Sequence, residues 1–270
     1  MNSHKKETND KGKSPEQILA ATVVAGHHKL EKPFLAKAIL GFIGGAMISL
    51  GYLLYIRIAA SALETFGPFS SILGACGFPI GLIIILMAGG ELITGNMMAV
   101  SAAFFAKKAK GWDLLKNWLM ITICNVLGAI FVAYVFGHFV GLTAHGIFKA
   151  EVIEVAHAKI AAGPLQAFVS GIGCNWFVGL ALWLNYGAQD AAGKVLGIWF
   201  PVMTFVAIGF QHSVANAFVI PAAIFEHGAT WFAFLENFVC VYLGNVVGGA
   251  VFVSLFYYLA YKQSLALKAD

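Results

Sequence analysis

Residues 207 to 224, AIGFQHSVANAFVIPAAI, place a histidine and two side-chain amides in the middle of an apolar run. The polar members are Gln211, His212, Ser213 and Asn216, and Gly209 precedes them. An imidazole exchanges a proton near neutral pH, and amides and hydroxyls donate hydrogen bonds without a fixed charge. An ionisable side chain in such surroundings indicates a functional site, because burying it without a partner costs free energy.

The composition predicts that these surroundings are a membrane. Of 270 residues, 60% are hydrophobic and 11% are charged, whereas a soluble domain carries about 25% charged residues. The mean hydropathy is +0.81. Continuous apolar runs favour spanning helices of about 20 residues over the alternating strands of a membrane β-barrel. We therefore predict an all-α membrane protein.

Six apolar units are long enough to cross a bilayer. Their predicted bounds are Phe34 to Ile56, Phe69 to Phe105, Asn117 to Val140, Leu165 to Leu184, Val195 to Phe225, and Phe238 to Tyr261. Ahead of them, Ser14-Pro15-Glu16-Gln17 is typical of a helix start, and we expect an interfacial helix up to Lys29. We thus predict an N-terminal tail with this helix (1–32), a six-span domain (33–262) and a C-terminal tail (263–270).

The distribution of Lys and Arg predicts the orientation. With six spans, both termini lie on one side, and only Arg57, Lys149 and Lys159 of the 17 basic residues fall on the other. The positive-inside rule therefore predicts that both termini are cytoplasmic. We read the net charge of +4 as a topology signal and expect no nucleic-acid partner.

A repeat relates the two halves of the chain. A shift of 120 residues aligns Gly89 with Gly209, Glu91 with Gln211, Asn96 with Asn216, Asn117 with Asn237, and Asn125 with Asn245. One offset that holds across two separate helices indicates a repeat of three spans, at approximately 33–140 and 159–262. Because three is odd, the copies are inverted, and their broken second helices, the second and fifth spans, meet near the bilayer midplane.

Two helix breaks at the midplane favour a small anion. The freed N–H groups at a helix start carry a partial positive charge, and two such ends converge here. Thr94 adds a hydroxyl opposite His212, and Asn175 and Asn245 add neutral amides, while neither break contains Lys or Arg. Weak sites of this kind favour passage over tight binding. An apolar path opposes an anion far more than its neutral acid, so we predict transient protonation of a weak-acid anion near His212.

The sequence resembles the formate/nitrite transporter family. The resemblance is carried by ELITGN at 91–96, CNW at 174–176, GFQHSVAN at 209–216 and GNVVGG at 244–249, and it is strongest to Bacillus-type formate channels. It implies homopentamers with an aquaporin-like protomer and one pore in each.

The resemblance also implies roles for individual residues. Thr94 and His212 would be the central polar pair, with Asn245 supporting His212 and Lys159 drawing anions into a vestibule. The cytoplasmic constriction would contain Leu82, Leu92 and Phe205, and the outer constriction would contain Phe78, Ile93, Asn175 and Val178. Many members have Glu where this chain has Gln211, so its pH gating would differ. Ile93 replaces a bulky aromatic residue, which would widen the outer constriction.

Several functions remain open from the sequence. Formate is the leading permeant. Nitrite, hydrosulfide, acetate and lactate remain alternatives, because they are also small monovalent anions of weak acids. A neutral-solute pore of the aquaporin kind would carry paired Asn-Pro-Ala ends, where this chain has TGN and VAN. An intramembrane enzyme would need a nucleophile, a metal cluster or a redox centre, and no motif of these kinds is found in the sequence. We therefore expect a transport protein in the bacterial plasma membrane, without a cofactor or a metal.

Overall fold

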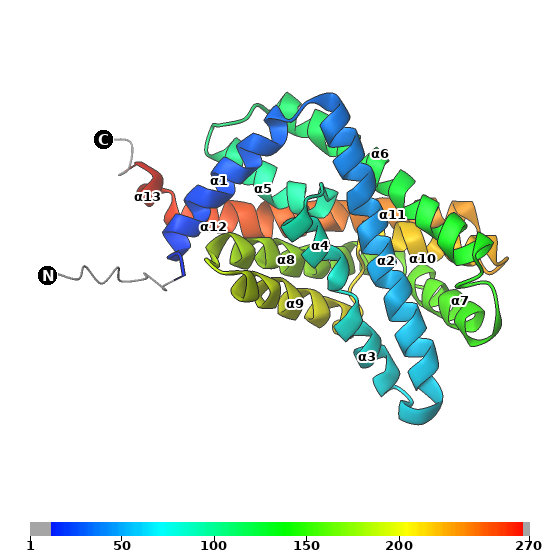
Figure 1. Ribbon diagram of the computed structural model, residues 1–270. Coiled ribbons are helices and arrows are strands. Elements are labelled where there is room, and N and C mark those ends of the chain that lie inside the picture. Colours follow the sequence, from blue (N-terminus) through cyan, green and yellow to red (C-terminus); the bar gives the residue numbers. More distant parts are fainter. Residues whose placement is uncertain (1–11, 267–270) are drawn as a thin grey trace, which may run out of the picture.

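The computed structural model describes residues 12–266, and the chain folds as a bundle of helices (Figure 1). The outer ends of both predicted tails, residues 1–11 and 267–270, lie outside the described residues. The helices are α1 (Pro15–Glu31), α2 (Phe34–Phe66), α3 (Phe69–Gly77), α4 (Ile80–Ala88), α5 (Ile93–Phe105), α6 (Gly111–Val132), the π-helix η1 (Ala133–Phe139), α7 (Gly146–Ile160), α8 (Pro164–Gly187), α9 (Ala191–Ile208), α10 (Ser213–Phe225), α11 (Trp231–Val246), the π-helix η2 (Val247–Leu255), α12 (Phe256–Tyr261) and α13 (Gln263–Ala266).

The six predicted membrane spans are confirmed. Within the described residues, six helical segments are long and apolar enough to cross a bilayer. The first span is longer than predicted and continues past Ile56 to Phe66. Arg57 is accommodated in this extension because its guanidinium lies 3.3 Å from the centroid of the Phe148 ring, a contact that stabilises the cation.

The second and fifth spans are interrupted, as predicted. The second is divided into α3, α4 and α5, and residues 89–92 between α4 and α5 are not helical. The fifth is divided into α9 and α10 by residues 209–212. Gly89 and Gly209 adopt φ angles of 107° and 89°, which an L side chain disfavours. A glycine therefore turns the chain where the helix before each break, α4 or α9, ends.

The two halves pack alike in space. Helix α2 packs along α6, and its counterpart α8 packs along α11; likewise α1 contacts α5, and α7 contacts α10. An offset of 130 residues maps Lys29 onto Lys159 and Phe34 onto Pro164, so α1 and α7 precede the two halves in equivalent positions. The short half-helix α5 is therefore covered by α1, and the short half-helix α10 is covered by α7.

The predicted N-terminal helix start is confirmed at α1. Ser14 and Gln17 form a reciprocal capping box, and Pro15 occupies the first turn. One face of the helix is buried, with Leu19 fully covered and Val23 7% exposed, because α1 packs against α5 and α8. Both described ends of the chain lie on the same side of the molecule (Figure 1).

Small residues let the helices approach closely. Membrane helices associate through tight packing, which favours glycine where backbones touch. A Cβ added to Gly45 on α2 would come within 1.9 Å of the Asn125 carbonyl oxygen on α6. Gly44, the next residue, meets the Glu91 carbonyl oxygen at 2.2 Å, so this part of α2 is pressed against the first helix break. The breaks therefore depend on close backbone contact for their position.

We expect Gly45→Ala to destabilise the protein. The methyl group would overlap the rigid backbone of α6, and overpacking of this kind costs about 1–3 kcal/mol. Gly163→Ala is the matched control, because a Cβ there meets nothing within 4 Å. Thermal unfolding of the purified protein in detergent should show a lower melting temperature for Gly45→Ala alone, and equal melting temperatures would contradict this account of the packing.

Candidate functional site

The central polar pair predicted from the sequence lies in contact. Thr94 Oγ1 and His212 Nε2 are 2.9 Å apart, and both side chains are buried. Thr94 belongs to the first turn of α5 and His212 is the N-cap of α10, so the pair joins the starts of the two half-helices. The two breaks thus meet at one point inside the protein.

The backbone of α10 determines which nitrogen of His212 carries the proton. His212 Nδ1 accepts a hydrogen bond from the Ala215 backbone N–H at 3.1 Å, as an N-cap side chain does. A nitrogen that accepts is unprotonated, so in the neutral ring Nε2 carries the hydrogen. Nε2–H therefore donates to Thr94 Oγ1, which leaves the Thr94 hydroxyl hydrogen free to donate to a further acceptor.

An aromatic stack lies beside this pair. The Phe205 ring stacks on His212 with centroids 6.1 Å apart, and Phe78 meets Phe205 edge-on at 5.9 Å. The resemblance assigns Phe205 and Phe78 to different constrictions, and the two rings contact each other beside the central pair. Phe205 also lines the cavity that contains Lys159, because α9 ends next to the break that carries His212. Its role in the cytoplasmic constriction stays a prediction.

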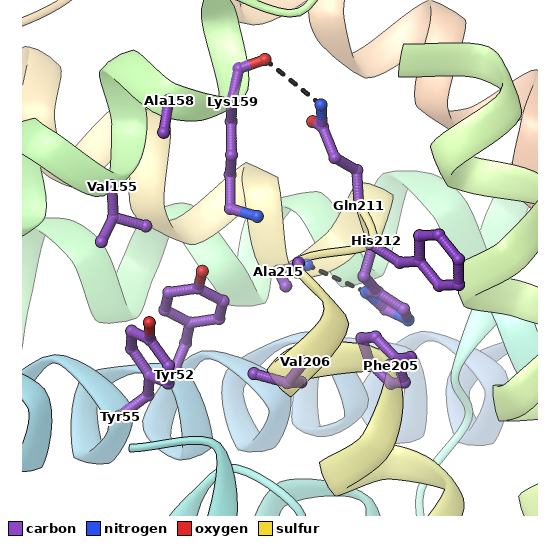
Figure 2. Close-up of a pocket in the computed structure, with 12 residues that line it drawn as sticks. Tyr52, Tyr55, Val155, Ala158, Lys159, Phe205, Val206, Gln211, His212 and Ala215 are labelled. Carbon is purple, nitrogen blue, oxygen red and sulfur yellow. Dashed lines mark hydrogen bonds between the residues drawn. The ribbon is translucent and has the colours of Figure 1, made fainter. Parts of the chain in front are cut away.

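A cavity of about 200 Å³ leads from the α7 side of the molecule to His212 (Figure 2). Its wall includes Lys159, Gln211 and Phe205, together with Tyr52 and Tyr55 of α2. The Lys159 ammonium lies 5.7 Å from the centroid of the Tyr52 ring, and Figure 2 shows it pointing into the cavity. Burial lowers the pKa of Lys159 to about 8. The cavity therefore offers a cation next to the buried imidazole.

Two asparagines stabilise the two breaks in the same way. Asn125 Oδ1 accepts from the Ile93 N–H at 2.8 Å, and its amide donates to the Glu91 carbonyl at 2.8 Å. Asn245 Oδ1 accepts from the Ser213 N–H at 2.9 Å, and its amide donates to the Gln211 carbonyl at 3.2 Å. Each side chain thus satisfies an N–H and a C=O that the interrupted helix leaves free.

Asn245 therefore supports His212 through the backbone, because its two partners, Gln211 and Ser213, flank the histidine in sequence. Asn175 also holds the backbone, since its amide donates to the Thr94 carbonyl at 3.2 Å and to the Asn245 carbonyl at 2.7 Å. Asn175 of α8 thus links the start of α5 to α11. The predicted amides thus surround the central pair and orient the segments that carry it.

Gln211 does not contact the imidazole. Its Oε1 accepts from Asn216 at 2.8 Å and from Asn237 at 2.9 Å, and its amide donates to the Lys159 carbonyl at 3.3 Å. The side chain therefore ties α7, α10 and α11 together. An amide at this position serves both as donor and as acceptor, which a carboxylate would not.

The first break carries an ion pair that sequence reasoning missed. The Glu91 carboxylate contacts Lys29 Nζ at 2.9 Å and Lys32 Nζ at 3.2 Å. The two lysines hold the carboxylate toward α1. Together with Asn185 and Tyr186 they line a second cavity, of about 290 Å³, on the side of the chain termini. The sequence did contain a signal for this position of Lys29, because an offset of 130 residues relates it to Lys159 near the second break.

The remaining predicted pathway residues are Leu82, Leu92, Ile93 and Val178. Each is at most 3% exposed, and all belong to the main hydrophobic core. None of them lines the cavity that contains Lys159. Their roles in the two constrictions stay predictions. Tyr52 and Tyr55 are wall residues that we did not anticipate, because tyrosines three apart on a long apolar helix carry no distinctive signal.

Comparison with known proteins agrees with this geometry. The family model for the formate/nitrite transporter matches residues 16–259. An uncharacterized transporter YrhG of Bacillus subtilis is 53% identical over 93% of this chain and 94% of its own, and the formate channel BtFdhC of Bacillus thuringiensis is 49% identical over 92% and 96%. A solved pentameric formate channel with formate bound has a TM-score of 0.74 at 28% identity and covers 85% of this chain and 98% of its own.

The match extends over nearly all of the described helices, from α1 to α12, and includes both breaks. The chain is a multi-pass membrane protein and belongs to the formate/nitrite transporter family.

Proposed function

We propose that this protein is a channel for formate. The observation that carries the proposal is the contact between Thr94 and His212, which leaves the Thr94 hydroxyl hydrogen as a neutral donor at the meeting point of both half-helices. Support for formate comes from the 49% identical relative named a formate channel and from the similar solved channel with formate bound. Nitrite and hydrosulfide are monovalent weak-acid anions of similar size, and the transport assays below compare them with formate.

In the proposed mechanism, the anion loses its water in stages. The cavity near Lys159 attracts it by charge, and the Phe205 and Phe78 rings exclude water next to the central pair. The Thr94 hydroxyl hydrogen, which is left free because the His212 Nε2–H donates to Thr94 Oγ1, replaces part of the lost hydration. The anion takes up a proton near this pair and continues as a neutral acid, which apolar surroundings oppose far less.

The imidazole donates a hydrogen bond without giving up its own proton. Release of the Nε2 proton from a neutral ring would leave an anionic imidazolate, and protonation at Nδ1 would break the hydrogen bond from Ala215. The proton that neutralises formate therefore enters with it, through the water of the cavity. The role of the histidine is to position the anion where that proton transfer is favourable.

We further propose the assembly and orientation of the channel. The similar solved channel is described as pentameric, which supports a homopentamer with a pore in each protomer. The distribution of basic residues supports both termini in the cytoplasm and the Lys159 cavity on the outer face of the plasma membrane. Residues 33–262 form the channel domain in this proposal, which assigns transport rather than catalysis to the chain.

We expect His212→Phe to reduce formate flux by about tenfold or more, because Thr94 Oγ1 then loses the bond that directs its hydrogen to the anion, and a hydrogen bond to a charged partner is worth about 1.5–3 kcal/mol. Formate, nitrite and hydrosulfide uptake into proteoliposomes should be measured in parallel. His145→Phe is the control, since His145 is an exposed residue before α7. Formate flux through His212→Phe that equals that of the control would exclude a central role for the imidazole.

The Lys159 cavity predicts a pH dependence of formate entry. A lysine whose pKa is about 8 is charged at pH 7 and mostly neutral at pH 9, so its attraction for anions declines as the outer pH rises. Lys159→Arg keeps its charge throughout this range. We expect the ratio of initial uptake rates, Lys159→Arg over wild type, to rise severalfold from pH 7 to pH 9.

This ratio removes the effect of outer proton concentration on the permeant, which is common to both proteins. Lys149→Arg is the control, because Lys149 lies on the same helix but contacts Glu226 at 3.8 Å and does not line the cavity. A constant ratio for Lys159→Arg over wild type would show that the charge of Lys159 does not govern entry.

A further inference from the structure

Two tyrosines line the Lys159 cavity and have no part in the mechanism described above. Tyr52 and Tyr55 are 5% and 8% exposed, and both belong to α2. Figure 2 shows their hydroxyls pointing toward the side of the cavity on which Lys159 lies, and neither has a hydrogen-bond partner among the described residues. Buried polar groups are nearly always paired. These two hydroxyls therefore leave their hydrogens to whatever occupies the cavity.

Packing fixes the positions of both rings. The centroid of the Tyr52 ring lies 5.1 Å from that of Tyr55 and 5.4 Å from that of Phe78, which it meets edge-on. Phe78 in turn contacts Phe205, which stacks on His212. Aromatic pairs at these separations stabilise one arrangement of the rings. The hydroxyls are thus held in place before an anion arrives, in the same row of rings as the central imidazole.

A cation completes this group of donors. The Lys159 ammonium lies 5.7 Å from the centroid of the Tyr52 ring, and Lys159 is the one charged residue of the described lining. Glu151 and Glu154 lie on the same helix, α7, but neither belongs to the lining. The cavity therefore presents an ammonium and two hydroxyls to an anion, with no carboxylate in the described part of its wall.

The repeat does not account for both hydroxyls. The offset of 130 residues that relates α1 to α7 also relates α2 to α8. It places Asn185, which lines the cavity on the side of the termini, at the position of Tyr55. The counterpart of Tyr52 is Leu182, a core residue that does not line that cavity. The Lys159 cavity thus has a hydroxyl at a position where the other half has an apolar side chain.

We propose that Tyr52, Tyr55 and Lys159 form a loading site for anions with two oxygens, an inference that rests on the proposed channel function. A carboxylate accepts hydrogen bonds at both oxygens, so one oxygen binds the ammonium while the other accepts from the hydroxyls. Hydrosulfide has a single sulfur, which accepts hydrogen bonds weakly. The hydroxyls therefore favour formate and nitrite over hydrosulfide. Because they are neutral, they add selectivity without the additional charge that would retain the anion.

The test removes the hydroxyls one at a time and together. Tyr52→Phe, Tyr55→Phe and the double variant keep the rings and therefore the contact with Phe78. Tyr134→Phe is the matched control, because it removes the same group from a tyrosine of η1 that does not line the cavity. Initial rates of formate and hydrosulfide uptake into proteoliposomes are measured against concentration, after subtraction of the rates in protein-free liposomes. Thermal unfolding shows whether each variant is folded.

We expect each single variant to raise the half-saturating formate concentration about threefold to tenfold and to keep the maximal rate within about twofold of wild type. A site that binds the anion ahead of the central pair determines affinity, and it does not limit the rate once the site is full. The double variant should raise the half-saturating formate concentration further. The half-saturating concentration of hydrosulfide should change less than about twofold in all three variants.

Unchanged half-saturating formate concentrations in the three cavity variants would overturn the loading site, and so would equal increases for formate and hydrosulfide. A lower maximal rate at an unchanged half-saturating concentration would overturn it as well, because the tyrosines would then serve the packing of α2. The channel function has its own readout in the wild type and Tyr134→Phe. If neither transports formate, that function fails, whereas transport by both with unaltered cavity variants refutes the loading site alone.

Discussion

The structure depends on satisfying the backbone of two helices that stop inside the membrane. Free N–H and C=O groups at that depth have no water to bind, and each costs several kcal/mol if left unpaired. Asn125 and Asn245 each supply one acceptor and one amide donor to the break beside them. Close packing of α2 on α6, and of α8 on α11, brings these asparagines to the breaks. The interrupted spans are thus stable because a neighbouring span completes their hydrogen bonds.

This way of stabilising the breaks determines the chemistry of the centre. Asparagine satisfies the backbone without a fixed charge, so the group left for a permeant is the neutral Thr94 hydroxyl, whose oxygen accepts from His212. A lysine in their place would hold an anion too strongly for flux, since conduction needs sites that release the ion. The same N-cap bond that completes α10 keeps His212 Nδ1 an acceptor. Helix capping and the bond to Thr94 therefore use the two different nitrogens of one ring.

The repeat, the six spans and the central pair could be predicted from the sequence because they depend on local composition and on one constant offset. The partners of charged residues could not, because they belong to different helices that only packing brings together. Glu91 illustrates this limit, since its lysines are about sixty positions away in the chain, Lys29 in the last turn of α1 and Lys32 at its C-cap. The contact between Phe205 and Phe78 has the same origin. It depends on how α9 packs against α3 and α4, which no periodicity in either segment records.

The two halves use different residues to reach a similar electrostatic result. On the side of the termini, the cavity lining contains Lys29, Lys32 and Glu91, so one positive charge remains after the carboxylate is counted. On the other side, Lys159 is the one charged residue of the described lining, and Gln211 replaces the carboxylate. Each of these two cavities therefore carries an excess of one cation at neutral pH. An approach with two uncompensated cations would retain anions, and a neutral one would not attract them. In the second half, Gln211 stands where the first half has Glu91, and the described lining has one lysine instead of two. These two differences cancel, so both cavities keep the same net charge.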